Sequence, residues 1–592
     1  MSAQVLAEAS FQAPSIQWSF LVPLLIIAGA GVLSVLVEAF ARQEVRRPIQ
    51  IVLVLGAQIV AFLDLLWLAV DTFGAGGKGP SLPVNQALHF DQWAVGIQAV
   101  LLICSILATL VMIDRTAAQQ DPFVATAAAV PGSDYEELAR QRGLQQTEVF
   151  PLMLFSITGM LIFPAAGDLV TMFVALEVMS LPLYVLTAMA RRRRLLSQEA
   201  AFKYFVLGSF ASALFLFGAA LLYGYSGSVT LYGIAQVAQG HAQSGSSPEF
   251  GLLIILGSIL VLAGVFFKMG AAPFQAWTPD AYQGAPTPIS GFMAACTKIA
   301  AVGVLLRILN FVVLLAPEDA RKALLGGIWV IAILTMIVGT VVGLTQTDMK
   351  RMLAYSSIGH AGFIIVAIMG MNEDTLQAVV FYLLAYGVAT IGAFGVITLV
   401  REVSDRGEVL GEATHIGQWA GLGKRSPLIA GAFSVFLLSF AGLPLTAGFI
   451  AKYTAFSSVI KSGVGANVDP SLFNPVPLVI VAIAASAISL FYYIRVIVLM
   501  FFVAPAEERE VTGELTQAGP NVADPAEDGD DGVLKTEAVR TSVVLLESTP
   551  HVEVVKSQGP TLAVIILAGV FVLAAGLFPT PILDVLGSLF GV

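Results

Sequence analysis

Cysteine, histidine and charge are all scarce in this chain. Its 592 residues include two cysteines and five histidines, and only 12% are Asp, Glu, Lys or Arg. Both cysteines, Cys104 and Cys296, lie in long apolar runs, so we expect a small buried hydrophobe at each and neither a disulfide nor a metal site. The sequence also lacks a Cys cluster, a haem-type ligand pair, a Gly-rich phosphate loop and a nucleic-acid motif. We therefore predict no redox centre, cofactor or nucleic acid bound to this chain.

Hydrophobic residues are abundant instead. They make up 57% of the chain, above the ~45–50% apolar share of soluble domains. Apolar runs repeatedly approach the ~20 residues that a helix needs to cross a bilayer. We predict an all-α polytopic membrane protein with about 14 transmembrane helices. The expected spans are 19–40, 49–70, 93–113, 148–165, 167–189, 197–223, 250–272, 286–314, 324–344, 352–370, 374–400, 427–461, 476–503 and 560–580.

Basic residues in the connections predict the orientation. One side holds twenty Lys and Arg residues, and the other holds only Lys78, Arg321, Lys322 and Lys461. Cytoplasmic loops carry the excess of Lys and Arg. The richer side is therefore expected in the cytoplasm and both termini outside. The N-terminus lacks the basic start of a signal peptide, so we expect the first span to be retained.

Five regions are expected along the chain. Residues 1–147 form three spans plus a cytoplasmic loop, 148–314 and 324–503 form two repeats, 504–559 form an acidic cytoplasmic loop, and 560–592 contain a C-terminal span. The acidic loop holds twelve acids against four bases, and its Pro, Gly and Asp content cannot bury a core, so we expect it to be disordered. A docking role for its apolar patch Val543–Leu546 is the alternative.

Each repeat contains one interrupted helix. The first is interrupted from Gly270 to Pro273, beside Lys268, and the second from Gly442 to Pro444, ahead of Lys452. Five spans per repeat is an odd number, so consecutive copies must lie upside down relative to each other, as in inverted-repeat transporters. Broken helices are tolerated at membrane depth where protein or water covers the freed backbone. We predict two inverted five-helix repeats with helices 7 and 12 broken.

Six ionisable residues at or near membrane depth are the candidate relay residues. A charged side chain at the bilayer centre costs roughly 2.5–3.5 kcal/mol on insertion scales and usually marks a functional site. Buried lysines can switch between charged and neutral forms, and histidine titrates near neutrality. The candidates are Glu177, Lys203, Lys268, Lys298, His360 and Lys452.

Each candidate also has a structural interpretation. Glu177, expected near the midplane, should pair with Lys203 or Lys268, and such a pair could serve only to fix helix register. The lysines could extend to the membrane interface, and His360 could be a satisfied core histidine. Arg307 and Arg495 are interpreted as anchors that bond loop carbonyls.

Several long motifs resemble a known family. GDLVTMFVALEVMSLPLYVL, EAAFKYFVLGSFASALFLFG, FFKMGAAPFQAWTPDAYQGAPTP, DMKRMLAYSSIGHAGF and GLPLTAGFIAKY are similar to the antiporter-like subunits of respiratory complex I, and most closely to subunit N of the proton-pumping NADH–quinone oxidoreductase. The resemblance spans roughly residues 145–500. It implies fourteen helices, two inverted five-helix repeats and a hydrated polar axis along the midplane. It also implies that Glu177, Lys268, Lys298 and Lys452 occupy the charged positions of helices 5, 7, 8 and 12.

Two positions bear on the assignment within the family. Lys452 favours subunit N, because subunit M and the D-type subunit of Mrp antiporters usually carry glutamate there. Gln275 stands where many relatives have histidine, which argues against an essential protonation at that position.

The resemblance further implies function and partners. It implies a subunit without redox groups in a bacterial plasma membrane, which translocates protons while NADH, FMN, Fe–S clusters and quinone act in partner subunits. An M-type antiporter-like neighbour, small membrane subunits and lipids are the expected partners. A subunit of a Mrp-type cation/proton antiporter and a non-pumping structural spacer are the alternatives.

Overall fold

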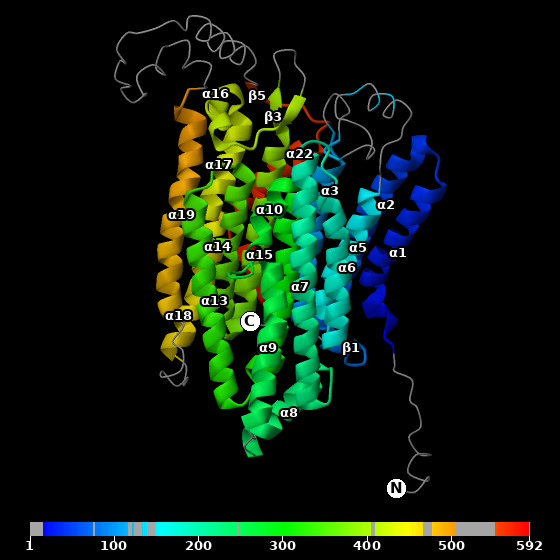
Figure 1. Ribbon diagram of the computed structural model, residues 1–592, viewed down its shortest axis with the longest axis vertical. Helices are drawn as coiled ribbons and strands as arrows, with labels where there is room; N and C mark the ends of the chain where they lie inside the picture. Colours follow the sequence, from blue (N-terminus) through cyan, green and yellow to red (C-terminus); the bar gives the residue numbers. More distant parts are fainter. Residues whose placement is uncertain are drawn as a thin grey trace, which may run out of the picture.

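In the computed structural model, long helices run along one axis of the molecule (Figure 1). The structure describes residues 16–74, 77, 79–115, 121–123, 133, 135, 138, 148–244, 248–403, 409–465, 476–504 and 551–590. Within these ranges twelve helices are long and apolar enough to cross a membrane. The prediction of an all-α polytopic membrane protein is therefore confirmed.

The helices follow the expected spans closely. The first region contains α1 (Trp18–Phe40), α2 (Gln43–Phe73), a hairpin of β1 (Ser81–Val84) and β2 (Leu88–Phe90), and α3 (Gln92–Ile113). The next contains α5 (Val149–Ile162) with a 3₁₀ turn (Phe163–Ala165), α6 (Leu169–Thr187), α7 (Arg194–Ser226), α8 (Leu231–Ser244), α9 (Pro248–Met269), α10 (Trp277–Gly284), α11 (Thr287–Phe292) and α12 (Lys298–Ile308). π-helical turns at Met293–Thr297 and Leu309–Val313 flank α12.

The second half continues in the same way. It contains α13 (Glu318–Leu344), α14 (Met349–Ile368), α15 (Glu373–Leu399), α16 (Leu422–Arg425), α17 (Pro427–Ala441), α18 (Ala447–Gly465), α19 (Val476–Phe502), α22 (Pro560–Leu577) and α23 (Thr580–Phe590). Two shorter apolar helices, Val149–Ala165 and Pro427–Ala441, occupy the two expected spans that the twelve long helices leave over. The number of helices that cross the membrane, and the inverted relation of the repeats, stay predictions.

Aspartates cap three of the membrane helices. Asp91, Asp168 and Asp348 each accept a hydrogen bond from a backbone N–H in the first turn of α3, α6 and α14. A side-chain oxygen at this position satisfies one of the backbone donors left free at a helix start. These carboxylates therefore fix helix ends.

Both predicted interruptions are present. α9 ends at Met269, Gly270 has φ +70°, and α10 begins only at Trp277. α17 ends at Ala441, Gly442 has φ +80°, and α18 begins at Ala447. The left-handed conformation at each break favours glycine because a Cβ atom would be strained there.

A small sheet lies at one end of the bundle. Strands β3 (Val400–Val403), β4 (Val409–Glu412) and β5 (His551–Val554) pair in the order β4-β3-β5, and β3 and β5 are at the upper end in Figure 1. β5 belongs to the segment predicted to be disordered, so that prediction is wrong for its last residues. The physical reason is that one edge of β3 offers unpaired backbone groups, which an extended segment can satisfy. The patch Val543–Leu546 lies outside the described residues.

Two arginines, Arg307 and the half-buried Arg495, confirm the predicted anchors. Arg307 is 1% exposed, donates to the Pro164 carbonyl, and lies 2.9 Å from each carboxylate oxygen of Asp91. Arg495 donates to the carbonyls of Leu344 and Gln346 at 3.3 and 2.7 Å. Both tie a helix to a connection from a distant part of the chain.

Asp91→Asn is expected to destabilise the folded protein by about 3 kcal/mol, because removing one partner of a buried pair leaves the other charge uncompensated. A denaturant titration of the purified protein in detergent would measure this. The matched control is Asp374→Asn, which loses only the pair with Lys461, whose side chain is 67% exposed. The control should change stability by less than about 1 kcal/mol. Equal effects of the two substitutions would contradict the anchoring role of Asp91.

Candidate functional site

Lys268 is enclosed by aromatic rings. It lies in the last turn of α9, directly before the first break, and is 2% exposed. Its Nζ is 5.1 Å from the ring centre of Tyr204, 5.3 Å from that of Tyr184 and 5.7 Å from that of Phe267. Among the described residues, Lys268 Nζ and both tyrosine hydroxyls have no hydrogen-bond partner. The rings can stabilise a cation through their π faces. The amine and the two hydroxyls can each form further hydrogen bonds.

Glu177 lies near Lys268. It is on α6 and interacts electrostatically with the lysine and with Tyr184. Its Oε1 atom is buried without a hydrogen-bond partner in the part of the chain that is described. Glu177 is therefore close enough to Lys268 to interact with it, but the predicted ion pair between them is not formed.

Lys203 does not pair with Glu177, so this part of the prediction is wrong. Its side chain is 45% exposed and forms ion pairs with Glu199 at 2.6 Å and Asp280 at 3.1 Å. The inward face of α7 carries Tyr204, one residue further on, and successive residues of a helix are rotated by about 100°. Because α7 is apolar on nearly every side, its sequence gave no indication of which face points inward.

Lys298 is held by α14. It is 2% exposed and starts α12 directly after the π-helical turn Met293–Thr297. Its Nζ donates to the backbone carbonyl of Ser357 and, at 2.6 Å, to the hydroxyl of the same residue, with the Tyr386 ring centre 5.3 Å away. π-helical turns often occur at functional sites because they shift side chains out of the regular helical register.

His360 lies between Lys298 and Lys452. Its Nδ1 is 2.7 Å from the Tyr382 hydroxyl, and its Nε2 has no partner within the described ranges. Both lysines are close enough to affect it electrostatically, and its ring centre is 5.0 Å from that of Tyr386. A role for His360 as a bridge between half-channels stays a prediction.

Lys452 binds the carbonyls that the second break sets free. It is 6% exposed, and its Nζ donates to the carbonyls of Phe440 at 2.8 Å and Ala441 at 3.0 Å and to the Ser486 hydroxyl at 2.8 Å. Phe440 and Ala441 are the last residues of α17, whose carbonyls have no partner further along a helix. The break therefore creates the acceptors for the lysine.

The candidates form two groups. Glu177 and Lys268 lie among α6, α7 and α9, whereas His360 is on α14 and Lys298 and Lys452 approach that helix from neighbouring elements. Within the described residues, no side-chain hydrogen bond or ion pair joins the two groups. Reasoning from sequence missed the contacting side chains, namely Tyr184, Tyr204, Ser357, Tyr382, Tyr386 and Ser486. Ser357 lies inside the DMKRMLAYSSIGH motif, but the tyrosines look like ordinary core residues.

Buried lysines beside broken helices in a polytopic bundle define a membrane protein of the antiporter-like class. The family described as NADH:quinone oxidoreductase/Mrp antiporter, transmembrane, matches residues 166–469. More narrowly, the chain belongs to the NADH-quinone oxidoreductase subunit N family. It is 48% identical over 583 residues to NADH-quinone oxidoreductase subunit N of Beutenbergia cavernae, a match that covers 98% of this chain and 99% of that protein. The subunit N of Rhodococcus opacus is 48% identical over 526 residues, with 85% and 91% covered.

Solved structures agree with this placement. A chain of respiratory complex I from Thermus thermophilus matches with a TM-score of 0.66 and 28% identity, covering 96% of this chain and 99% of that one. A chain of the Mrp complex from Dietzia matches with a TM-score of 0.70, 20% identity and 97% of each chain covered. At that lower identity the second match shows the shared fold alone.

Proposed function

We propose that this chain is a membrane-arm subunit of a NADH–quinone oxidoreductase and translocates protons through Glu177, Lys268, Lys298, His360 and Lys452. One observation carries the proposal. The three lysines are buried inside the apolar bundle, and within the described residues their Nζ atoms contact only carbonyls, hydroxyls and aromatic rings. Buried charges in proteins are normally paired. Three buried amines without an ion pair fit a role in which each amine gains and loses a proton.

The surroundings of each amine suit proton exchange. Carbonyl and hydroxyl acceptors stabilise the ammonium forms of Lys298 and Lys452, and Glu177 favours the ammonium form of Lys268 electrostatically. Near Lys268 the unpaired atoms of Glu177, Tyr184 and Tyr204 require hydrogen-bond partners, and ordered water is the usual one at such buried sites. This supports a hydrated route that reaches Lys268 past Glu177.

Charge coupling would drive the relay. Quinone reduction in partner subunits would alter the electrostatics at Glu177, and its interaction with Lys268 would change. Because Coulomb interactions persist over several ångströms in a low dielectric, the shift would pass through His360 to Lys298 and Lys452. Lys203 lies outside this row, on the exposed face of α7.

Partners complete the activity. NADH, FMN, Fe–S clusters and quinone would act in other subunits, and this chain would contact an M-type antiporter-like neighbour, small membrane subunits and lipids. In a bacterial plasma membrane the sheet end of the bundle would face the cytoplasm and both termini the outside, as the distribution of Lys and Arg indicates.

Ser357→Ala tests the relay at Lys298. The substitution removes one acceptor of the amine, and a hydrogen bond to a charged group contributes about 1.5–3 kcal/mol. We expect proton pumping by inverted membrane vesicles to slow about tenfold, measured beside NADH–quinone electron transfer. The neighbouring Ser356→Ala, which loses contacts with Tyr493 and Tyr492 rather than one with the lysine, should pump at close to the wild-type rate. Normal pumping by Ser357→Ala would count against proton exchange at this lysine.

A cation/proton antiporter is the second candidate, since the Mrp chain shares the fold. The high identity to subunits N over almost the whole chain favours the oxidoreductase. NADH-linked activity of the purified parent complex would distinguish the two candidates, because an antiporter complex would have none. A structural spacer would instead tolerate neutral substitutions at Glu177, Lys268 and Lys452.

A further inference from the structure

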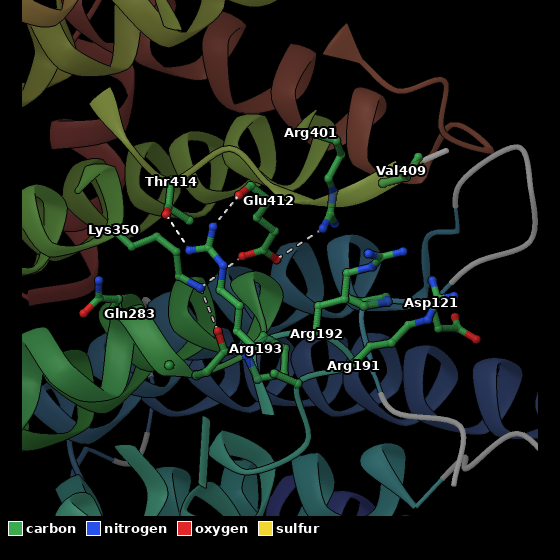
Figure 2. A pocket seen from close by; sticks show the side chains of 15 residues that line it. Asp121, Arg191, Arg192, Arg193, Gln283, Lys350, Arg401, Val409, Glu412 and Thr414 are labelled. Atoms are coloured by element: carbon green, nitrogen blue, oxygen red, sulfur yellow. Dashed lines mark hydrogen bonds and ion pairs between the residues drawn. The ribbon is translucent and has the colours of Figure 1, made fainter. Parts of the chain in front are cut away.

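A small cavity with strongly basic walls lies at the sheet end of the bundle (Figure 2). Its volume is 60 Å³, and it is enclosed by the α6–α7 connection, the α10–α11 connection, the first turn of α14 and strands β3 and β4. The charged side chains that line it are five bases and two acids: Arg191, Arg192, Arg193, Lys350, Arg401, Asp121 and Glu412.

The carboxylate of Glu412, in the cavity wall, already interacts with two basic side chains. Its carboxylate is 3.2 Å from Lys350 Nζ and 3.5 Å from the Arg401 guanidinium, while Lys350 also donates to the Ala285 carbonyl at 2.7 Å. Burial raises the pKa of Glu412, but Lys350 and Arg401 outweigh burial and bring the pKa to about 2. The carboxylate is therefore charged at neutral pH and is already shared between two cations.

The arginines approach the cavity from two sides. Arg193 donates to the Thr414 hydroxyl at 2.7 Å and to the Glu412 carbonyl at 3.4 Å, and it lies 3.5 Å from Glu402. In Figure 2 the Arg192 side chain points toward Arg401. Burial lowers the pKa of Arg401, Glu412 opposes this, and the nearby Arg191 lowers it further. Like charges thus crowd one wall.

Arg193 also holds a strained backbone conformation. Its φ is +54°, in the left-handed region, which a non-glycine residue keeps only when the surrounding structure enforces it. The contacts with Thr414 and Glu412 provide that enforcement. The α6–α7 connection is therefore held with its consecutive arginines at the cavity. This favours a preformed binding site over an accidental surface arrangement.

We propose that this cavity binds a phosphate group. Excess positive charge in a partly buried enclosure is stabilised by an anion that accepts several N–H donors at once, and guanidinium groups match phosphate oxygens in pairs. On the same measure one water molecule needs about 10–15 Å³, so a cavity of about 60 Å³ has room for a phosphate-sized group. Arg191 and Arg192 have further interactions of their own, and the phosphate would share these side chains.

The phosphate could belong to a phospholipid headgroup or be free in solution. Basic pockets between membrane helices at the cytoplasmic side recognise lipid headgroups, and the same donors would accept inorganic phosphate. The proposal does not depend on proton translocation, because no residue of the cavity belongs to the relay.

The test uses the purified parent complex. Phosphate binding is followed with radiolabelled inorganic phosphate, and retained phospholipids are counted by native mass spectrometry. Arg192→Gln should weaken phosphate binding about tenfold or remove one retained phospholipid, because it deletes a charge-assisted donor pair. Arg192→Lys, which keeps the positive charge but not the paired N–H donors of the guanidinium, should have a smaller effect. Arg42→Gln, an exposed arginine at the start of α2, should change neither quantity.

Each result decides the question. Weakened phosphate binding with unchanged lipids identifies a site for free phosphate, and loss of one phospholipid identifies a headgroup site. Wild-type complex that neither binds phosphate nor retains a phospholipid overturns the proposal without any variant. Assembled Arg192→Gln complex with unchanged affinity and lipid count overturns it as well, and Arg192→Lys serves that comparison should the glutamine variant not assemble.

Discussion

Lys268→Met is expected to reduce proton pumping to less than about a hundredth of the wild-type rate, the range over which a positioned proton-transfer group contributes to catalysis. Methionine keeps an unbranched apolar side chain that can pack against Tyr184, Tyr204 and Phe267. It cannot carry a proton or respond to Glu177. The protein should therefore assemble, while the first group of relay residues loses its only amine.

Pumping and NADH–quinone electron transfer must be measured side by side in membranes that carry the variant. Lys203→Met is the matched control, because that lysine lies on the exposed face of α7 and pairs with Glu199 and Asp280. We expect the control to pump at close to the wild-type stoichiometry. Unchanged stoichiometry in Lys268→Met would remove this lysine from the mechanism and favour a structural spacer.

Local features of the chain were predictable from sequence. Gly270 and Pro273, and Gly442 and Pro444, end helices for steric reasons that act within a few residues, and both breaks are where expected. Lys298 is buried, as its place well inside an apolar run suggests. Such features need no knowledge of which helix packs against which.

Features that depend on packing could not be predicted. The face of α7 that points inward is decided by contacts with α6 and α9, so Lys203 was placed beside Glu177 although it lies outside. The rings around Lys268 come from α6 and α7, and β5 forms because β3 presents an open edge far away in the sequence. In a chain that is apolar nearly everywhere, hydropathy marks helices but not their orientation.

The second half of the site is organised by one helix. α14 places Ser357, His360 and Phe363 at three-residue intervals, so that they contact Lys298, Tyr382 and Lys452 in turn. Residues three apart lie on one side of a helix. In the proposed relay, a change of charge at Lys298 would act on His360 and Lys452 through side chains that this one helix holds in place.

Lys298→Arg separates a relay from a fixed charge. Arginine keeps a positive charge and can still donate to Ser357, but it does not release its proton in proteins. If Lys298 acts by exchanging a proton, both Lys298→Arg and Lys298→Met should pump at less than about a tenth of the wild-type rate. Lys461→Arg, at an exposed lysine paired with Asp374, controls for the substitution itself. Normal pumping by Lys298→Arg together with failure of Lys298→Met would show that this position needs a permanent charge, and proton exchange would then have to bypass it between His360 and the first group of relay residues.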